Sequence, residues 1–302
     1  MVRSIEIVEV GPRDGLQNEA LLVSTADKVA LIRRCVAAGA RRIEVASFVN
    51  PRKVPQMADA EAVVAALGAV AGVTRIGLVL NLRGAERALA CGVDQLGAVA
   101  VASDEFGMRN QGQSSAQSVA EARAIIGMAK AAGRSAQVTI AAAFGCPFEG
   151  EVDPARVIEM ARRLAEAGPC EIALADTIGV AVPAAVTVLV TAVRAAIAPL
   201  PVRVHFHDTR NTGIANVWAA VAAGAATVDA ALGGLGGCPF APGAAGNVAT
   251  EDVAYLLQRS GVETGLELDR LLEASHWLAG VMGKALPASL ARAGAFPAKA
   301  AS

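Results

Sequence analysis

The chain has 302 residues, and its 27 Lys and Arg residues nearly balance 28 Asp and Glu residues, so the formal net charge is −1. Hydrophobic residues make up 54% and charged residues 18%, a composition that excludes intrinsic disorder and suffices for a large core. The balanced charge argues against a nucleic-acid-binding surface, and an aromatic content of 3% argues against base-stacking platforms.

No secretory or membrane-spanning segment is expected. The first ten residues include Glu6 and Glu9 where a signal peptide needs an uninterrupted apolar run. The most apolar long stretch, 180–193, contains Pro183 and is too short to span a membrane. The five cysteines are scattered and form no Cys-x-x-Cys pair. We therefore expect a reduced, cytoplasmic protein with no membrane or nucleic-acid partner.

Short β-branched runs alternate with alanine-rich helical segments along the whole chain. The eight predicted strands span residues 5–10, 42–46, 75–80, 95–102, 137–143, 171–175, 202–206 and 227–232. The predicted helices between and after them span 26–38, 58–67, 84–90, 118–132, 154–167, 183–198, 214–223 and 249–258. Several of these helices are followed by Gly, the residue favoured just after a helix. Further helices are predicted at 266–274 and 276–285, with a loose tail from Pro287.

This order of elements predicts an α/β fold, a TIM (β/α)8 barrel with extra C-terminal helices, because buried parallel strands are apolar without alternation. The alternative is an open doubly wound sheet, which usually has fewer strands and a Gly-rich first turn that is absent here. No linker-like stretch divides the chain. We expect a single domain over 1–302, with the barrel at about 5–260 and the C-terminal helices at about 261–290.

Polar or charged side chains follow nearly every predicted strand, whereas the strand bodies are apolar. They include Asp14, Ser47, Asn81, Asp104, Asp176 and Asp208. The catalytic residues of a TIM barrel lie at these C-terminal strand ends. Burying such groups without partners is costly, so we expect them to converge on a metal and a polar substrate.

Two of the three histidines, His205 and His207, lie two residues apart at the end of the seventh predicted strand. Alternating side chains place both imidazoles on one face, where they are either metal ligands or a hydrogen-bonded core pair. Asp14, at the end of the first strand, would add an anionic oxygen to two nitrogens. That mixed set suits Mg²⁺, Mn²⁺ or another divalent ion, and no nearby cysteine indicates structural zinc.

Arg13 would lie beside such a metal. Its guanidinium either holds a carboxylate or an enolate oxygen of a substrate, or forms an internal ion pair with Glu44 or Asp176.

Cys238 follows four glycines in the loop after the last predicted strand. Its thiol is either an acid or base beside a ligand or a buried hydrophobic group. Asn247, nine residues later, is either a carbonyl ligand or the N-cap of the helix at 249–258, and spacing alone favours the cap.

Several long motifs together resemble 3-hydroxy-3-methylglutaryl-CoA (HMG-CoA) lyase, a family of TIM-barrel metallolyases that cleave carbon–carbon bonds. They occur in the same order as in that family, and the resemblance extends from about residue 5 to 285. The motifs occupy residues 11–19, 43–49, 54–59, 176–179, 205–209 and 233–252.

The resemblance implies a site and a reaction. It implies that Asp14, His205, His207 and Asn247 bind a divalent cation, Mg²⁺ or Mn²⁺. It implies that Arg13 stabilises an enolate, that Cys238 is the acid or base, and that Asp176 and Glu44 complete the polar site. The implied reaction is a retro-Claisen cleavage of HMG-CoA to acetyl-CoA and acetoacetate, and a homodimer is expected from the family.

Two departures from the family pattern bear on the acyl group of the substrate rather than on the chemistry. Typical members have Tyr-Gly-Gln where this chain has Arg210-Asn211-Thr212, and 103–110 differs from a usually lysine-rich segment. Both segments are expected on loops at the catalytic face. Arg210 either pairs with a substrate carboxylate or with Asp208 or Asp104.

The alternatives to an HMG-CoA lyase are therefore a lyase for a related substrate such as citramalyl-CoA, a Claisen-type synthase, and a non-catalytic metal- or CoA-binding protein. The synthases usually carry extra C-terminal domains for which this chain has no room.

Overall fold

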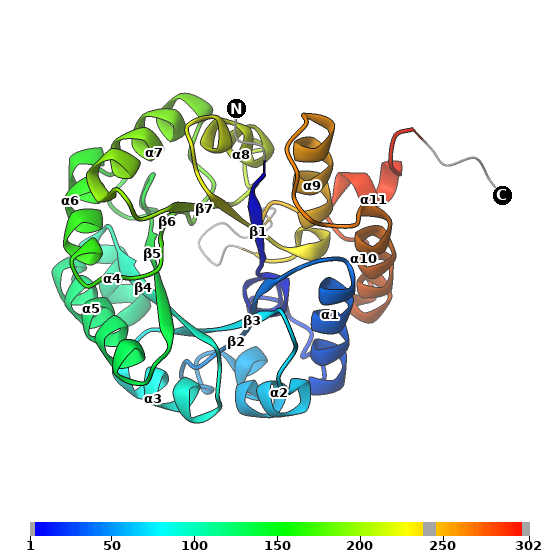
Figure 1. Cartoon of the computed structure of the whole chain (residues 1–302), viewed down its shortest axis with the longest axis horizontal. Coiled ribbons are helices and arrows are strands. Elements are labelled where there is room, and N and C mark those ends of the chain that lie inside the picture. Colours follow the sequence, from blue (N-terminus) through cyan, green and yellow to red (C-terminus); the bar gives the residue numbers. More distant parts are fainter. Residues whose placement is uncertain (1–3, 238–245, 298–302) are drawn as a thin grey trace.

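The computed structural model describes residues 4–237 and 246–297. Its centre is a closed barrel of eight parallel strands in sequence order (Figure 1). The strands are β1 (Glu6–Glu9), β2 (Arg42–Ser47), β3 (Thr74–Val79), β4 (Gln95–Val101), β5 (Ser135–Ala141), β6 (Ile172–Asp176), β7 (Val202–Phe206) and β8 (Thr227–Ala230). Parallel pairing of β1 with β8, from Glu6 opposite Thr227 to Glu9 opposite Ala230, closes the barrel. The predicted fold is confirmed.

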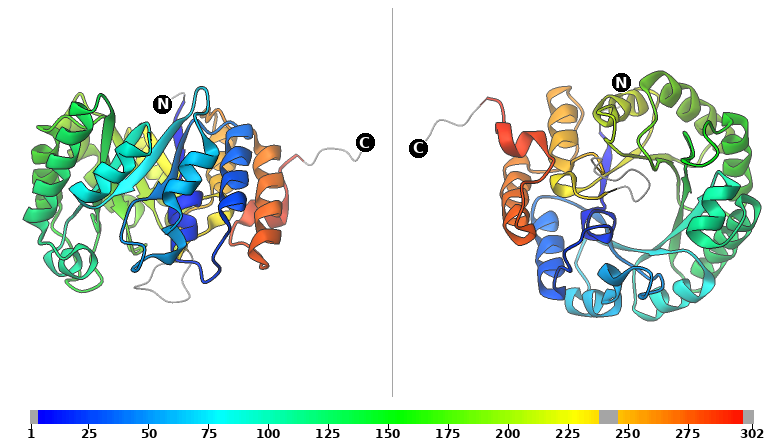
Figure 2. Two further views of the ribbon diagram at one scale, coloured as in Figure 1. Left: turned by 90° about the horizontal axis from the view of Figure 1, so that it is seen from below. Right: turned by 180° about the vertical axis from the view of Figure 1, so that it is seen from behind.

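Helices surround the barrel. They are α1 (Thr25–Ala37), α2 (Ala60–Leu67), α3 (Leu82–Ala90), α4 (Asp104–Gln111), α5 (Ser115–Ala131), α6 (Pro154–Ala165), α7 (Pro183–Ile197), α8 (Gly213–Ala222), α9 (Thr250–Arg259), α10 (Leu268–Met282) and α11 (Ser289–Ala293). Short helical turns occur at η1 (Gly11–Gly15), η2 (Pro55–Met57) and η3 (Leu232–Gly234). The side and rear views show α10 beside α1, outside the barrel (Figure 2). None of the described helices is long and apolar enough to cross a membrane.

Apolar and polar residues do not alternate along the strands, because both faces of the strands are covered. All five residues of β6 are buried, as are all five of β7. Outward side chains pack against the helices, while inward side chains fill the barrel or line its mouth. This arrangement brings the ends of β1, β7 and β8 together around one opening.

Three predicted elements differ from the structure. The two predicted helices at 266–274 and 276–285 are one helix, α10, in which Ser275 is buried. The segment expected as a loop at 103–110 contains α4, which Ser103 caps by accepting a hydrogen bond from Phe106 N. The expected tail contains the short helix α11. Side chains supply hydrogen bonds at the starts of the last two helices that the local pattern did not reveal: Ser103 at α4 and Asp252, which accepts from Ser289 N and Leu290 N, at α11.

Candidate active site

The loop after β1 holds Arg13 and Asp14 at the mouth of the barrel. It is a tight π-helical turn, in which Val10 O accepts hydrogen bonds from Arg13 N at 3.1 Å and Asp14 N at 2.7 Å. A Cβ at Gly11 would lie 2.6 Å from Glu9 Oε1, so a side chain there would displace the buried Glu9 carboxylate. The turn therefore presents two adjacent charged side chains toward the barrel axis.

His205 and His207 face Asp14 from the opposite side of this opening. The alternation of β7 continues to His207, one residue beyond the strand, and turns both rings inward, with their centroids 5.2 Å apart. Each Nε2 lies 3.9 Å from Asp14 Oδ2, and the candidate ligand atoms of the three residues lie within 4.8 Å of one another. These distances suit three ligands around one ion rather than a direct hydrogen bond.

Asn247 joins this cluster from the segment after β8. Its backbone forms a bridge to His207, and its Nδ2 donates to Asp14 Oδ2 at 2.8 Å and to Leu235 O at 3.0 Å. The prediction that it caps a helix is wrong, because α9 begins at Thr250 with Ala249 at the N-cap. The long-range contact with Asp14 replaces the local cap.

The amide oxygen of Asn247 tests whether the cluster fits a metal. Asn247 Oδ1 is buried and has no hydrogen-bond partner among the described residues. A buried acceptor without a partner is costly, and a cation would satisfy it. With a carboxylate oxygen and two imidazoles, the donor set is the mixed O and N type that binds Mg²⁺ or Mn²⁺. The four residues therefore fit a divalent cation.

Arg13 is held by two carboxylates. Its Nε donates to Glu44 Oε2 at 2.7 Å, and its Nη1 pairs with Asp14 Oδ1. The predicted internal ion pair with Glu44 therefore exists. Burial opposes the charge on Asp14, but Arg13 and the two histidines outweigh it and hold the pKa of Asp14 well below its usual value. The Asp14 carboxylate is thus kept ionised as a metal ligand requires.

Asp176 points its carboxylate into its own loop, not to Arg13. Its two oxygens accept hydrogen bonds from Val180 N and Ala181 N, each at 2.9 Å. Burial raises the pKa of Asp176 above its usual value in spite of these bonds. The carboxylate therefore holds the start of the segment that leads into α7.

A cavity of about 480 Å³ opens beside the cluster. Arg13, Asp14, Glu44, His205 and His207 lie on its wall. An apolar group of side chains lines another part of the wall: Val49, Leu78, Leu80, Val99, Val101 and Phe106. Polar side chains add hydrogen-bonding groups: Asn50, Lys53, Asn81, Asn110 and Gln113. Such a mixture of apolar surface and a few polar groups is typical of a small-molecule site. Cys238 lies outside the described residues, so its position relative to this cavity is not part of the structure.

The sequence pattern missed Asp229, which is on β8 and lines the same cavity. Its Oδ2 lies 3.2 Å from His205 Nδ1, on the side of the ring away from Asp14. An acidic residue inside an apolar strand was the available signal, since it would need a partner within the barrel.

The two segments that depart from the family pattern lie in different surroundings. Phe106 and Asn110 of α4 line the cavity, whereas Arg210 is not among its lining residues. Arg210 Nη1 donates to Ile178 O and Gly179 O, both at 2.9 Å. The alternative in which Arg210 pairs with Asp208 or Asp104 is therefore wrong. Asp208 accepts from Gly213 N, and Asp104 pairs with Arg156.

Comparisons with known proteins show the family of the chain. The HMGL-like family model matches residues 4–278. The chain is 44% identical to (R)-citramalyl-CoA lyase of Chloroflexus aurantiacus, covering 97% of this chain and 96% of that protein. It is 40% identical to the mitochondrial hydroxymethylglutaryl-CoA lyase of Macaca fascicularis, covering 96% and 90%. An HMG-CoA lyase structure from Acinetobacter baumannii, in complex with coenzyme A and 3-methylmalate, has a TM-score of 0.94 at 38% identity and coverages of 99% and 98%.

Proposed function

Because the chain belongs to the HMGL-like family, whose matched relatives are CoA-ester lyases, we propose that it is a divalent-metal-dependent lyase that cleaves a 3-hydroxy-acyl-CoA. The observation that carries this proposal is the cluster of Asp14, His205, His207 and Asn247, in which the first three side chains lie on the wall of a cavity with both apolar and polar surface. The CoA moiety of the thioester would lie toward solvent, and its acyl group would reach the cluster.

Asp14, His205, His207 and Asn247 would hold Mg²⁺ or Mn²⁺. A bound cation supplies Lewis acidity, which polarises the C3 hydroxyl and a carboxylate oxygen of the acyl group. Two further roles belong to side chains of the chain itself. Asp14 contributes negative charge, and Glu44 restrains the guanidinium of Arg13 on the cavity wall.

The cleavage is a retro-Claisen reaction. A base removes the proton of the C3 hydroxyl, C3 becomes a carbonyl carbon, and the electron pair of the C2–C3 bond moves into the enolate of acetyl-CoA. Arg13 stabilises the enolate oxygen until an acid protonates C2. We assign the acid or base role to the Cys238 thiol, and we place Asp176 and Glu44 in the polar surroundings of the site.

Two substrates remain close candidates. HMG-CoA would give acetyl-CoA and acetoacetate, whereas citramalyl-CoA has one methylene fewer before its free carboxylate and would give acetyl-CoA and pyruvate. The similarity of the chain to lyases of both kinds supports both. Since α4 lines the cavity and Arg210 does not, we expect residues of α4 to distinguish the acyl groups.

A panel of acyl-CoA esters tests the proposal. Purified protein with Mg²⁺ or Mn²⁺ should release acetoacetate from HMG-CoA or pyruvate from citramalyl-CoA, and EDTA should abolish release. Cleavage of another 3-hydroxy-acyl-CoA alone would show that both named substrates are wrong. Condensation without cleavage would favour a synthase, and metal binding without either reaction would favour a non-catalytic binding protein.

Replacing the assigned thiol tests its role separately. Turnover of Cys238→Ser should be lower by about 100-fold or more, because a hydroxyl is a much weaker acid than a thiol. The variant should keep its affinity for Mn²⁺. Cys91→Ser is the matched control, since Cys91 is a free thiol of α3's C-terminus away from the cavity. Turnover of Cys238→Ser equal to that of the control would refute the assignment.

A further inference from the structure

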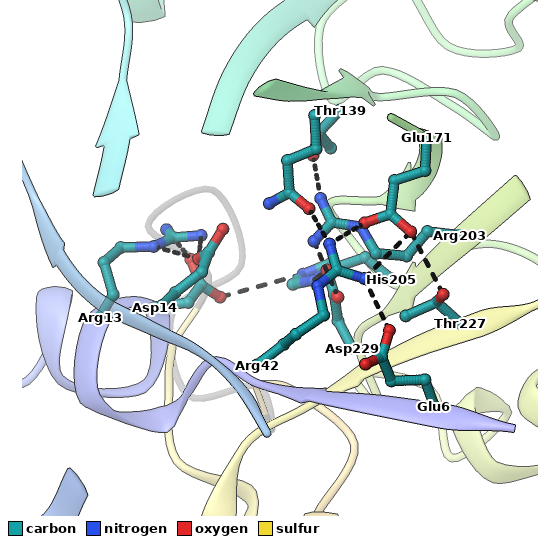
Figure 3. A network of polar contacts seen from close by, with 12 residues as sticks. Glu6, Arg13, Asp14, Arg42, Thr139, Glu171, Arg203, His205, Thr227 and Asp229 are labelled. Carbon is teal, nitrogen blue, oxygen red and sulfur yellow. Dashed lines mark hydrogen bonds and ion pairs between the residues drawn. The ribbon is translucent and has the colours of Figure 1, made fainter. Parts of the chain in front are cut away.

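A layer of charged and polar side chains lies inside the barrel next to the candidate metal ligands Asp14 and His205 (Figure 3). Arg203 is its centre, with no exposed side-chain surface. Arg203 Nη2 donates to Thr139 Oγ1 at 2.9 Å, and its Nε lies 3.6 Å from Glu171 Oε1. Its Nη1 lies 3.3 Å from Asp229 Oδ1. Burying a charged guanidinium costs free energy, because the charge loses its contact with water. The presence of Arg203 in this layer therefore needs an explanation.

Asp229 connects this layer to the cluster above it. One carboxylate oxygen faces Arg203, and the other lies 3.2 Å from His205 Nδ1. The opposite ring nitrogen, Nε2, faces Asp14. A carboxylate is an acceptor only, so its hydrogen bond with the ring places the proton on Nδ1. The lone pair of Nε2 is then directed toward the position of a metal.

We propose that Arg203 and Asp229 are positioning residues that hold His205 in the Nδ1–H tautomer and thereby set the affinity of the cluster for its divalent cation. This inference rests on the proposed metal-dependent function and deepens it. Arg203 keeps the carboxylate turned so that one oxygen is always available to His205. Thr139 and Glu171 in turn restrain the guanidinium.

Replacing the carboxylate by an amide gives a prediction with a definite direction. In Asp229→Asn the single amide oxygen can face either Arg203 or His205. Arg203 is a donor only, so it attracts that oxygen and leaves the amide N–H groups facing Nδ1. The ring must then accept at Nδ1 and carry its proton on Nε2, where it blocks a metal. We expect the Mn²⁺ dissociation constant to rise about 10- to 100-fold.

Removing Arg203 in that background should reverse part of the effect. In the double variant Arg203→Met, Asp229→Asn, the amide oxygen is free to turn to His205 and restore the Nδ1–H tautomer. Metal affinity should therefore lie closer to that of the unmodified protein than in Asp229→Asn alone. Arg75→Met is the matched control, because Arg75 is likewise a buried arginine paired with a carboxylate, Asp94, but lies away from Asp229 and the cavity. It should lower thermal stability and leave metal affinity unchanged.

The tautomer is observable directly, because the chain contains three histidines, and His276 is exposed and serves as an internal reference. Long-range ¹H–¹⁵N spectra of the full chain labelled at histidine distinguish the two neutral forms, and they are recorded with and without Mg²⁺ well above the usual pKa of histidine, because Asp229 and Asp14 raise the pKa of His205 in spite of its burial. Calorimetric titration with Mn²⁺ supplies the dissociation constants, and thermal unfolding shows whether each variant is folded.

The outcomes separate this inference from the proposed function. An unchanged tautomer and unchanged metal affinity in folded Asp229→Asn would overturn the role of Asp229. No recovery in the folded double variant would overturn the role of Arg203, and if the double variant is unfolded, Arg203→Gln in the Asp229→Asn background replaces it. Failure of the unmodified protein to bind Mn²⁺ would refute the metal-dependent function. The spectra would still decide which tautomer His205 adopts.

Discussion

Glu9 is a buried carboxylate behind the turn that carries Arg13 and Asp14. Its Oε1 accepts hydrogen bonds from Gly11 N at 2.7 Å and Leu232 N at 2.9 Å, and its Oε2 accepts from Thr250 Oγ1 at 2.7 Å. Burial raises the pKa of Glu9 from 4.5 to about 7 although these bonds favour the ionised form. One side chain thus joins the loops after β1 and β8 to the start of α9.

The pKa of Glu9 predicts how stability depends on pH. The native state retains the proton of Glu9 between 4.5 and about 7 while the unfolded state loses it, so this group reduces the free energy of unfolding as pH rises through that window. Glu9→Gln keeps an acceptor for both N–H groups and a donor for Thr250. It should gain up to about 3 kcal/mol over the unmodified protein by the upper end of the window, and little below its lower end.

Urea unfolding across this pH range measures the difference. Glu86→Gln, at an exposed position of α3, is the control and should run parallel to the unmodified protein. A curve for Glu9→Gln that also runs parallel would mean that Glu9 does not titrate in this window.

At the scale of elements, the segment from 246 to 249 packs against the end of β7. Asp208 N donates to Gly246 O at 2.8 Å, and Val248 N donates to Phe206 O at 3.1 Å. A Cβ on Gly246 would lie 2.0 Å from Gly236 O, a backbone atom that cannot move aside cheaply. The position of Asn247 in the cluster therefore depends on the absence of a side chain on the preceding residue.

Gly246→Ala should push this segment away from Gly236 and move Asn247. Because a ligand displaced by a fraction of an ångström binds poorly, we expect about 10-fold or more weaker Mn²⁺ binding by calorimetry. Gly127→Ala is the control, since a Cβ there meets nothing within 4 Å and the residue lies inside α5. It should raise stability by up to about 1 kcal/mol without changing metal affinity. Equal affinities in the two variants would contradict the argument.

At the scale of the whole molecule, the cluster joins the two ends of the barrel sequence. Asp14 and Asn247 are 233 residues apart and in direct contact, and β1 pairs with β8 beside them. A cation bound by both residues would stabilise the closed barrel and not the unfolded chain.

Metal should therefore raise the unfolding temperature. At a free Mn²⁺ concentration of about 100 times the dissociation constant, the gain is about 2.7 kcal/mol, or an increase on the order of 5 °C in a chain of this size. Differential scanning calorimetry with excess Mn²⁺ and with EDTA measures it. Asp14→Asn should abolish the increase, and an increase that survives in this variant would place the metal elsewhere.

The sequence by itself predicted the eight strands, the barrel and the inward pair of His205 and His207, because burial on both faces and alternation along a strand are local properties. It also placed Asp14 at the catalytic end of β1. It favoured a helix cap for Asn247, since local spacing carries no information about a partner 233 residues away.

Only the tertiary structure decided which polar groups meet. It turned Asn247 toward Asp14, placed Asp229 behind His205, paired Arg13 with Glu44, and directed Asp176 and Arg210 to the backbone of neighbouring loops. The physical reason is that closure of the barrel sets the distances between strand ends. Hydrogen-bonding partners are chosen by those distances, and a pattern of hydrophobic residues specifies the strands without specifying the partners.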